Sequence, residues 1–507
     1  MVRTRIAPSP TGQPHIGTIY QAMFDYVFAK KYKGAFVVRI EDTDRTRFVE
    51  GAEEVVLDAL DWFGLHPDEG PRNPKDAGPY RQSERLEKYK EHKDILVNRF
   101  LPMLSEKQRE ADNQGHYCAY YCFCTKERLT QLREEQQSRK QVPRYDKYCL
   151  NISRSEAAER SKHESHVIRL NIPKDYAIKF DDWLVGDVEV TSNDVDDQVL
   201  IKADGFPTYH FAVVVDDQLM HITHIFRGRE WLPSTPKHII LYYYFGWERP
   251  IYVHLPLILN MDGKGKLSKR HGHASVNFYK EEGYLPDAIL NYLANIVWNH
   301  PEGKEIFGIK EFEEKLHINQ IGGAVTVYAN TNEKVKEIIS KGGHEQFLTS
   351  QGPRFDLDKL KWVNQQYIQN EKSDEELEKI ILDFSSRAKE LPEKTLHSLI
   401  PLVKSRMNTL KEFDSLTEVF FNPPLPSSIT DKEKTVAKKL HEALEELTQW
   451  EHESIFMAIK LLLVEYKVKM SFFYLLLTGK ERGLPLPETM EILGKEKVIT
   501  RLKQIEV

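Results

Sequence analysis

The sequence of 507 residues predicts an α/β fold that carries an insertion and is followed by an all-helical region. Three observations support this prediction. The first forty residues have the pattern of one βαβ unit, and buried-strand patterns return after a charged stretch in the first half of the chain. From about Glu281 onward, apolar residues recur at i, i+3 and i+4, and no strand pattern of comparable quality follows. A chain of this length should hold three or more domains.

The βαβ unit begins almost at the first residue. Arg3 to Ile6 is short and β-capable and is followed at once by prolines, which indicates a strand that ends in a turn. Apolar residues at helical spacing then run from Ile16 to Val27 until Gly34 stops the pattern, and AFVVRIED indicates a second buried strand. Such a unit leaves the helix N-terminus at the carboxyl edge of the sheet, where phosphates bind readily.

Two loops predict a nucleotide site. His15 and Gly17 fall in the first turn of the helix, where an imidazole N–H can reach a phosphate and a missing Cβ allows close approach. Without other evidence, such residues more often indicate a capped helix with an exposed histidine than a nucleotide site. The distant loop NMDGKGKLSKRH supplies Lys266 and Lys269. Together the two loops can close on a triphosphate from two sides, which suits a reaction that expels pyrophosphate.

Several motifs of the sequence resemble those of a known family. PSPTGQPHIGT and KLSKR are similar to the two signature motifs of class I aminoacyl-tRNA synthetases, and RIEDTDRTR, GPYRQSER, DGFPTYHFA and REWLPSTPKH resemble the bacterial type of glutamyl-tRNA synthetase. The resemblance extends from Arg3 to the C-terminal PLPETMEILGKEKVITRL. It implies that ATP activates L-glutamate to glutamyl-adenylate, which is transferred to the 2′-hydroxyl of the terminal adenosine of tRNA(Glu).

The resemblance also implies a domain order. A Rossmann-type class I catalytic domain would occupy residues 1–93 and 206–258, interrupted at 94–205 by an inserted domain that binds the tRNA acceptor end. The KLSKR loop and a helical stem-contact domain would follow at 259–350, and a helical anticodon-binding domain at 351–507. The helical pattern excludes the β-barrel anticodon region of the glutaminyl branch.

Site residues follow from the same motifs. Those implied for ATP are His15, Gly17, Thr18, Lys266, Ser268 and Lys269, of which His15, Lys266 and Lys269 would act in catalysis together with Mg²⁺. Those implied for glutamate are Arg5, Ser9, Glu41, Tyr209 and Arg227. The chemistry of glutamate agrees with these residues. Its ammonium group needs a carboxylate partner, and its two carboxylates need guanidinium partners. The α-carboxylate is already a nucleophile, so adenylate formation needs positioning and charge neutralisation rather than a general base.

Some positions depart from the family pattern. Thr18 stands where class I enzymes often carry a second histidine, Val213 where an asparagine is usual and Arg229 where an acid is usual. Val213 cannot hydrogen-bond a substrate. An apparent insertion at 322–351, rich in Gly, Thr and Lys, has no functional interpretation.

The four cysteines suggest a metal site. Cys118, Cys122, Cys124 and Cys149 all lie in the predicted insertion, where a cytosolic protein would hardly form disulfides. YCFC and PRYDKYC resemble the zinc knuckle of some glutamyl-tRNA synthetases, which implies that Cys122, Cys124 and Cys149 bind Zn²⁺. The usual fourth ligand falls on Asn151, a poor zinc donor, so Tyr145 is the implied substitute, with Cys118 or a histidine behind it. Reduced structural cysteines are the alternative.

The net charge of −6 neither supports nor excludes tRNA binding. No segment has a transmembrane pattern and no leader is evident, so we expect a cytoplasmic monomer that binds tRNA(Glu), ATP and L-glutamate. Arg406, in KSRMNTLKEF, falls where discriminating members of the family place an arginine that recognises the final anticodon base.

Two functions of other classes compete with this interpretation. A nucleotidyltransferase that does not use tRNA could share the βαβ unit and the lysine loop, but it would not need the long helical half. An inactive tRNA-binding scaffold would have little reason to retain His15, Glu41 and Lys269 together.

Overall fold

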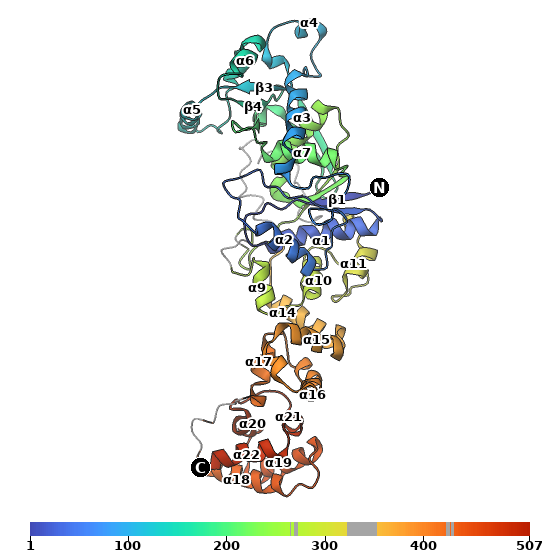
Figure 1. The fold of residues 1–507 in the computed structure, drawn as a ribbon, viewed down its shortest axis with the longest axis vertical. Helices are drawn as coiled ribbons and strands as arrows, with labels where there is room; N and C mark the ends of the chain where they lie inside the picture. Colours follow the sequence, from blue (N-terminus) through green and yellow to red (C-terminus); the bar gives the residue numbers. More distant parts are fainter. Residues whose placement is uncertain (264, 268–271, 322–351, 422–425, 427–429, 507) are drawn as a thin grey trace. The chain divides into compact units, whose positions relative to one another are not determined.

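The computed structural model describes every residue except 264, 268–271, 322–351, 422–425, 427–429 and 507. The chain divides into two compact units, Met1–Asn277 with Leu290–Asp356, and Phe278–Ile289 with Leu357–Val507. The division falls within α9 (Val276–Glu281) and α10 (Pro286–Asn295). In Figure 1 the first unit runs from blue to yellow, and most of the second is orange and red.

The first unit begins with the predicted βαβ arrangement. Strands β1 (Arg3–Ile6) and β2 (Ala35–Val38) are parallel, with Arg3 opposite Ala35, and α1 (Ile16–Lys31) connects them. Both strands are largely buried, which agrees with their apolar sequences. Gly34 lies between helix and strand, where a Cβ would collide with the carbonyl of Val2. The glycine therefore allows the helix to return directly to the sheet.

A second sheet of this unit has four strands in the order β6-β5-β9-β8. Its strands are β5 (Ala177–Asp182), β6 (Gly186–Thr191), β8 (His224–Gly228) and β9 (Ile251–Leu255). β8 and β9 are parallel, and the register places Arg227 opposite His254. The N–H of Thr223 donates to the carbonyl of Arg3 at 2.9 Å, so β1 lies beside β8. The carboxyl ends of β1, β2 and β8 therefore approach one region, as expected at an α/β sheet edge.

The remaining strands form an antiparallel sheet of order β3-β4-β7, built from β3 (Ala119–Cys122), β4 (Val167–Leu170) and β7 (Val199–Ile201). The other helices of this unit are α2 (Ala52–Trp62), α3 (Leu86–Asn98), α4 (Glu106–Arg109), α5 (Lys126–Ser138), α6 (Arg154–Arg160), α7 (Tyr209–Leu219), α8 (Thr235–Phe245) and α11 (Ile309–Lys315). Figure 1 shows β3, β4, α5 and α6 together at one end of the unit, away from α1 and α2.

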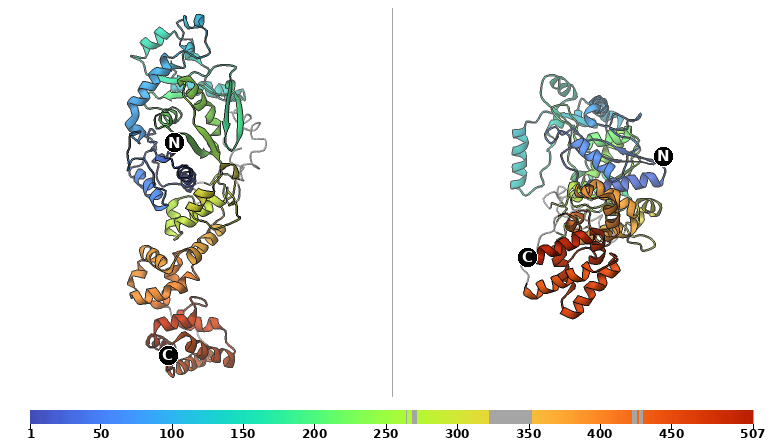
Figure 2. Two further views of the ribbon diagram at one scale, coloured as in Figure 1. Left: turned by 90° about the vertical axis from the view of Figure 1, so that its right-hand side faces the viewer. Right: turned by 60° about the horizontal axis from the view of Figure 1, so that its bottom comes forward.

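In the second unit every regular element of the described residues is helical. Its helices are α14 (Leu357–Gln366), α15 (Asp374–Phe384), α16 (Glu393–Lys404), α17 (Glu412–Leu416), α18 (Asp431–Glu445), α19 (His452–Tyr466), α20 (Met470–Thr478), α21 (Leu486–Leu493) and α22 (Lys495–Glu506). Helices α18 to α22 share one apolar core, and their red segment is visible in both views of Figure 2. The predicted α/β fold followed by a helical region is thus confirmed. Within the described part of the chain, no helix is both long and apolar enough to cross a membrane.

Candidate active site

The turn between β1 and α1 is organised by His15. This residue caps α1 with extended backbone angles, and its Nδ1 accepts the N–H of Gly17 at 2.9 Å. A Cβ at Gly17 would lie 2.9 Å from the same Nδ1, so the glycine is required by the histidine cap itself. Because Nδ1 is an acceptor here, a neutral His15 ring carries its proton on Nε2, where it can be donated to an anion.

The segment that follows the basic loop is held against this turn. Ile16 donates its N–H to the carbonyl of Ala274 at 2.8 Å, and Val276 donates to Pro14 at 3.1 Å. A cavity of about 370 Å³ lies alongside, lined by His15, Gly17, Thr18, Glu230, Lys266 and further residues of β9 and the loop after it. Lys266 is ion-paired with Glu230. The two predicted loops therefore meet, although Ser268 and Lys269 lie outside the described residues.

A larger cavity of about 780 Å³ adjoins the first. All five residues predicted for glutamate line it, namely Arg5, Ser9, Glu41, Tyr209 and Arg227. His15 and Thr18 line both cavities, which makes the two spaces neighbours. The ring of Trp231 packs against that of Tyr209 with centroids 4.5 Å apart and forms part of the wall. Cationic, anionic and aromatic groups are thus gathered around one space beside the His15 turn.

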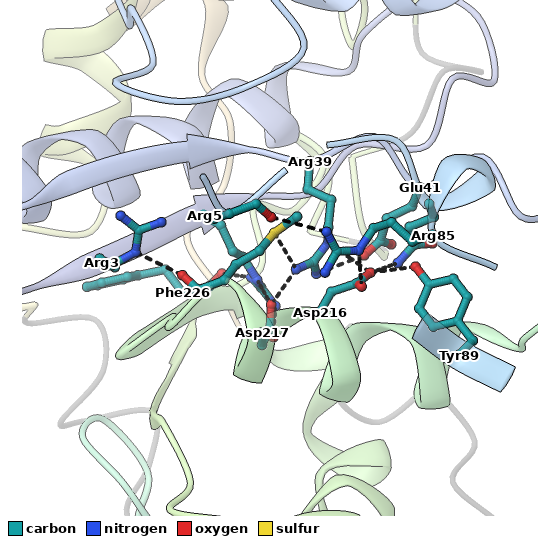
Figure 3. A network of polar contacts seen from close by, with 12 residues as sticks. Arg3, Arg5, Arg39, Glu41, Arg85, Tyr89, Asp216, Asp217 and Phe226 are labelled. Carbon is teal, nitrogen blue, oxygen red and sulfur yellow. Dashed lines mark hydrogen bonds and ion pairs between the residues drawn. The ribbon is translucent and has the colours of Figure 1, made fainter. Parts of the chain in front are cut away.

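On the β1 side of the larger cavity, buried charges are paired with one another (Figure 3). Arg5 contacts Asp217 through two nitrogens at 3.1 and 3.2 Å, and Arg39 donates to the same carboxylate at 2.7 Å. Arg39 also reaches Glu41 at 3.3 Å. The neighbouring carboxylate of Asp216 accepts hydrogen bonds at 2.6–2.9 Å from Gln82, Arg85 and Tyr89. Although burial by itself raises the pKa of Asp217, Arg5 and Arg39 lower it below its usual value.

Glu41 is the carboxylate that this network presents to the cavity. Its backbone N–H donates to the carbonyl of Pro8 at 3.0 Å, which fixes it near the end of β1. Burial raises the pKa of Glu41 to about 7, and the attraction of Arg39 and Arg5 opposes the rise. A carboxyl group with such a pKa gains much of its charge when a cation arrives, so it is suited to an ammonium ligand.

On the β8 side, Arg227 contacts neutral acceptors. Its Nε donates to Nε2 of His254 at 2.9 Å, one Nη donates to the hydroxyl of Thr235 at 2.8 Å, and the other lies 3.3 Å from Nδ1 of His238. The side chain is buried and lines the cavity. Among the residues that the structure describes, no acidic side chain forms an ion pair with Arg227.

Of the three departures from the family pattern, Thr18 lines both cavities, whereas the other two lie behind the cavity wall. Val213 is fully buried in α7, and Arg229 is buried in the turn after β8. Neither lines the two cavities that the described residues form at this site.

Three cysteines gather at the end of β3. The sulfurs of Cys122, Cys124 and Cys149 lie within 4.8 Å of one another. The hydroxyl of Tyr145 is 3.3 Å from two of them, Cys122 and Cys124. The hydrogen bond between Cys122 and Cys149 lowers the pKa of the Cys122 thiol and raises the pKa of the Cys149 thiol. Cys118 is turned away and contacts the carbonyl of Phe100. The three sulfurs are close enough to hold a metal ion, and a buried group of cysteines is consistent with zinc.

Several residues of the site were not found from the sequence. Those missed are Arg39, Asp217, Trp231, His238 and His254. One available signal was the pair Asp216–Asp217 in the apolar run of α7, because buried acids require cationic partners. Arg406, predicted for the anticodon, is exposed directly after α16.

Comparisons with known proteins identify the class. A family model described as "tRNA synthetases class I (E and Q), catalytic domain" matches residues 1–332, and one described as "Anticodon binding domain" matches residues 360–506. The chain therefore belongs to the class I tRNA synthetases of the E and Q family.

Relatives that match over the full length are more specific. The chain is 38% identical to the glutamate--tRNA ligase of Clostridioides difficile, covering 100% of this chain and 99% of the relative. It is 39% identical to that of Ectopseudomonas mendocina, covering 99% and 94%. Among solved structures, the glutamate tRNA ligase from Elizabethkingia meningosepticum in complex with its amino acid matches with a TM-score of 0.80 at 33% identity, covering 100% and 99%.

Proposed function

We propose that this protein is a glutamate--tRNA ligase that activates L-glutamate with ATP and transfers it to the 2′-hydroxyl of the terminal adenosine of tRNA(Glu). The observation that carries the proposal is the larger cavity, where Glu41, Arg5 and Arg227 face one space next to the His15 turn. Glu41 would bind the ammonium and the arginines the two carboxylates, with Ser9 and Tyr209 lining the pocket. A site of this kind rejects glutamine, because a neutral amide leaves a buried guanidinium uncompensated.

The smaller cavity would hold ATP. His15 would donate from Nε2 to a phosphate oxygen, Gly17 and Thr18 would lie along the nucleotide, and Lys266 would move from Glu230 to the phosphates. By sequence, Ser268 and Lys269 would add to the same binding. The glutamate α-carboxylate would attack the α-phosphorus as pyrophosphate leaves, and Mg²⁺ would arrive with ATP as part of the substrate. The residues would supply orientation and charge neutralisation.

Transfer follows from the same placement. The 2′-hydroxyl of the terminal adenosine would attack the carbonyl carbon of the mixed anhydride, and AMP would leave. The acceptor end would reach this site from residues 94–205, and the anticodon would contact the helical unit, where Arg406 is exposed. A monomer in the cytoplasm suffices for this activity.

The cysteine cluster would bind one zinc ion through Cys122, Cys124, Cys149 and Tyr145. The three sulfurs lie within 4.8 Å of one another, and the Tyr145 hydroxyl is 3.3 Å from two of them, whereas Cys118 contacts the carbonyl of Phe100, which supports these ligands over Cys118. Bound zinc would stabilise the fold of this segment. Protein purified without added metal should contain close to one zinc per chain, and Cys124→Ser should lose it. A metal-free protein with three titratable thiols would show that these are reduced structural cysteines.

The function is tested by charging purified tRNA(Glu) and tRNA(Gln) with labelled glutamate. We expect tRNA(Glu) to be charged, and transcripts whose anticodons end in C to be preferred over those ending in G. Arg406→Gln should narrow that preference by about 1–3 kcal/mol, the scale of one good base contact. An unchanged ratio would remove Arg406 from anticodon recognition, and a failure to charge either tRNA would overturn the proposed function.

A further inference from the structure

The β8 side of the larger cavity contains a buried guanidinium that forms no ion pair with any acidic side chain in the described part of the chain. Arg227 is 2% exposed, and its guanidinium hydrogen-bonds to two imidazoles and one hydroxyl. An uncompensated guanidinium is costly to bury, so a site that retains one has a use for its charge. On the proposed function, that use is the capture of a substrate carboxylate. What keeps the guanidinium in place without neutralising it is therefore a separate question.

The hydrogen-bond directions answer it, because arginine can only donate. The Nε of Arg227 faces Nε2 of His254, so this nitrogen must be an unprotonated acceptor. The remaining proton of a neutral His254 is then on Nδ1, which lies 2.7 Å from Oδ2 of Asp182. The carboxylate therefore accepts from Nδ1 and fixes the tautomer in which Nε2 can accept from Arg227. Burial lowers the pKa of His254 and keeps the ring neutral, although Asp182 opposes the shift.

The contact between Arg227 and His238 follows the same hydrogen-bond direction. Nδ1 of His238 faces Arg227 and must accept, so its proton lies on Nε2, which is 3.0 Å from Nδ1 of His210. Burial lowers the pKa of both histidines, that of His210 to about 3. Both imidazole neighbours of the guanidinium are thus neutral acceptors. Protonation of either would place two donors face to face.

Asp182 is itself firmly held. Its Oδ1 accepts the N–H groups of Leu184 and Val185 at 3.0 and 2.9 Å, and its Oδ2 accepts the backbone N–H of His254 at 3.2 Å. Strand pairing places it there, because Asp182 at the end of β5 is in register with Tyr252 on β9. Neither Asp182 nor His254 lines the cavity. Their effect on a bound substrate must therefore pass through Arg227.

We propose that Asp182 and His254 are positioning residues that hold Arg227 toward the larger cavity as a receptor for a carboxylate of the substrate. The inference rests on the proposed function. An acidic residue in place of His254 would hold Arg227 equally well, but its carboxylate would neutralise the charge of the guanidinium. A neutral imidazole gives direction alone, and the Asp182 carboxylate that sets its tautomer stays on the far side of the ring. The preference for glutamate over glutamine would depend on this arrangement.

The first test is Asp182→Asn. Its amide would either present N–H groups to His254, which favours the wrong tautomer, or present them to the backbone donors of Leu184 and Val185. We expect the KM for glutamate in tRNA charging to rise about tenfold or more, the usual cost of losing such a supporting carboxylate, while the KM for ATP changes less than twofold.

His254→Leu should raise the KM for glutamate in the same way, and His254→Gln, which retains an acceptor, should recover part of the loss. A matched control is His224→Leu, because His224 is also buried on β8 but packs against Phe28 and Trp183.

The second test is a double-mutant cycle between Asp182→Asn and Arg227→Gln, read as the KM for glutamate. If Asp182 acts through Arg227, its substitution should have little further effect once Arg227 is replaced. Equal effects on both backgrounds, or equal rises in the KM values for glutamate and ATP, would overturn the inference. Failure of the wild-type protein to charge tRNA(Glu) would instead overturn the proposed function. If Asp182→Asn does not fold, the cycle is made with His254→Leu.

Discussion

The two sides of the larger cavity hold arginines in opposite electrostatic settings. On the β1 side, Arg5 and Arg39 share the carboxylate of Asp217, and every charge has a partner (Figure 3). On the β8 side, Arg227 is bound by neutral imidazoles and a hydroxyl. One side is an ion network that would be stable without a ligand. The other leaves a positive charge for a ligand to neutralise.

This difference separates stability from binding. Breaking a buried ion pair leaves a charge without compensation and weakens the fold. Removing a cation that was never compensated costs the fold little but deprives an anionic substrate of its partner. The family motifs assign Arg5 and Arg227 the same task, yet the structure predicts different consequences for the network behind each one.

The largest effect should come from the β1 side. Asp217→Asn would leave Arg5 and Arg39 sharing a neutral amide, and we expect the free energy of unfolding to fall by about 3–5 kcal/mol. Urea denaturation followed by circular dichroism measures this change. Asp181→Asn is the control, because Asp181 pairs with Arg249 at the surface and should cost no more than about 1 kcal/mol. Equal losses for the two variants would show that the buried network is not a source of stability.

Arg227→Gln should have a somewhat smaller effect, and on a different quantity. We expect kcat/KM for glutamate to fall about 100-fold or more, or about 3 kcal/mol, because the substrate carboxylate would lose its partner. The free energy of unfolding should change little. Parallel charging assays and urea titrations of one preparation make the comparison direct. A variant that unfolds as readily as Asp217→Asn would contradict the proposed difference between the two sides.

How much of this site could be predicted depends on how each residue is connected. His15 was predicted from the start of a helix, and Glu41 and Arg227 were predicted from contiguous motifs that resemble the family; all three line the larger cavity. His254 lies 27 positions from Arg227 and meets it only because β8 and β9 pair in one register. Asp182 comes from the segment expected to be the insertion, and it reaches the site because β5 pairs with β9. Strand register is a property of the folded sheet that sequence periodicity does not fix.

The smallest predicted effect concerns pH and belongs to Glu41. Its pKa is raised to about 7 by burial, against the attraction of Arg39, so the folded protein retains a proton that the unfolded chain loses near pH 4.5. This group therefore contributes less to stability as pH rises from about 4.5 to 7, and above 7 its contribution stays constant.

Binding of glutamate changes with pH in the opposite direction, because the substrate ammonium prefers the ionised carboxylate of Glu41. We expect the KM for glutamate to fall about tenfold, or about 1.4 kcal/mol, between pH 6 and pH 8, with the KM for ATP as internal control. Glu41→Gln should bind glutamate weakly at every pH and lose this dependence. A wild-type KM for glutamate that stays constant over the range would mean that Glu41 is already ionised at pH 6, and that the Arg39 side of the cavity stabilises its charge more strongly than burial opposes it.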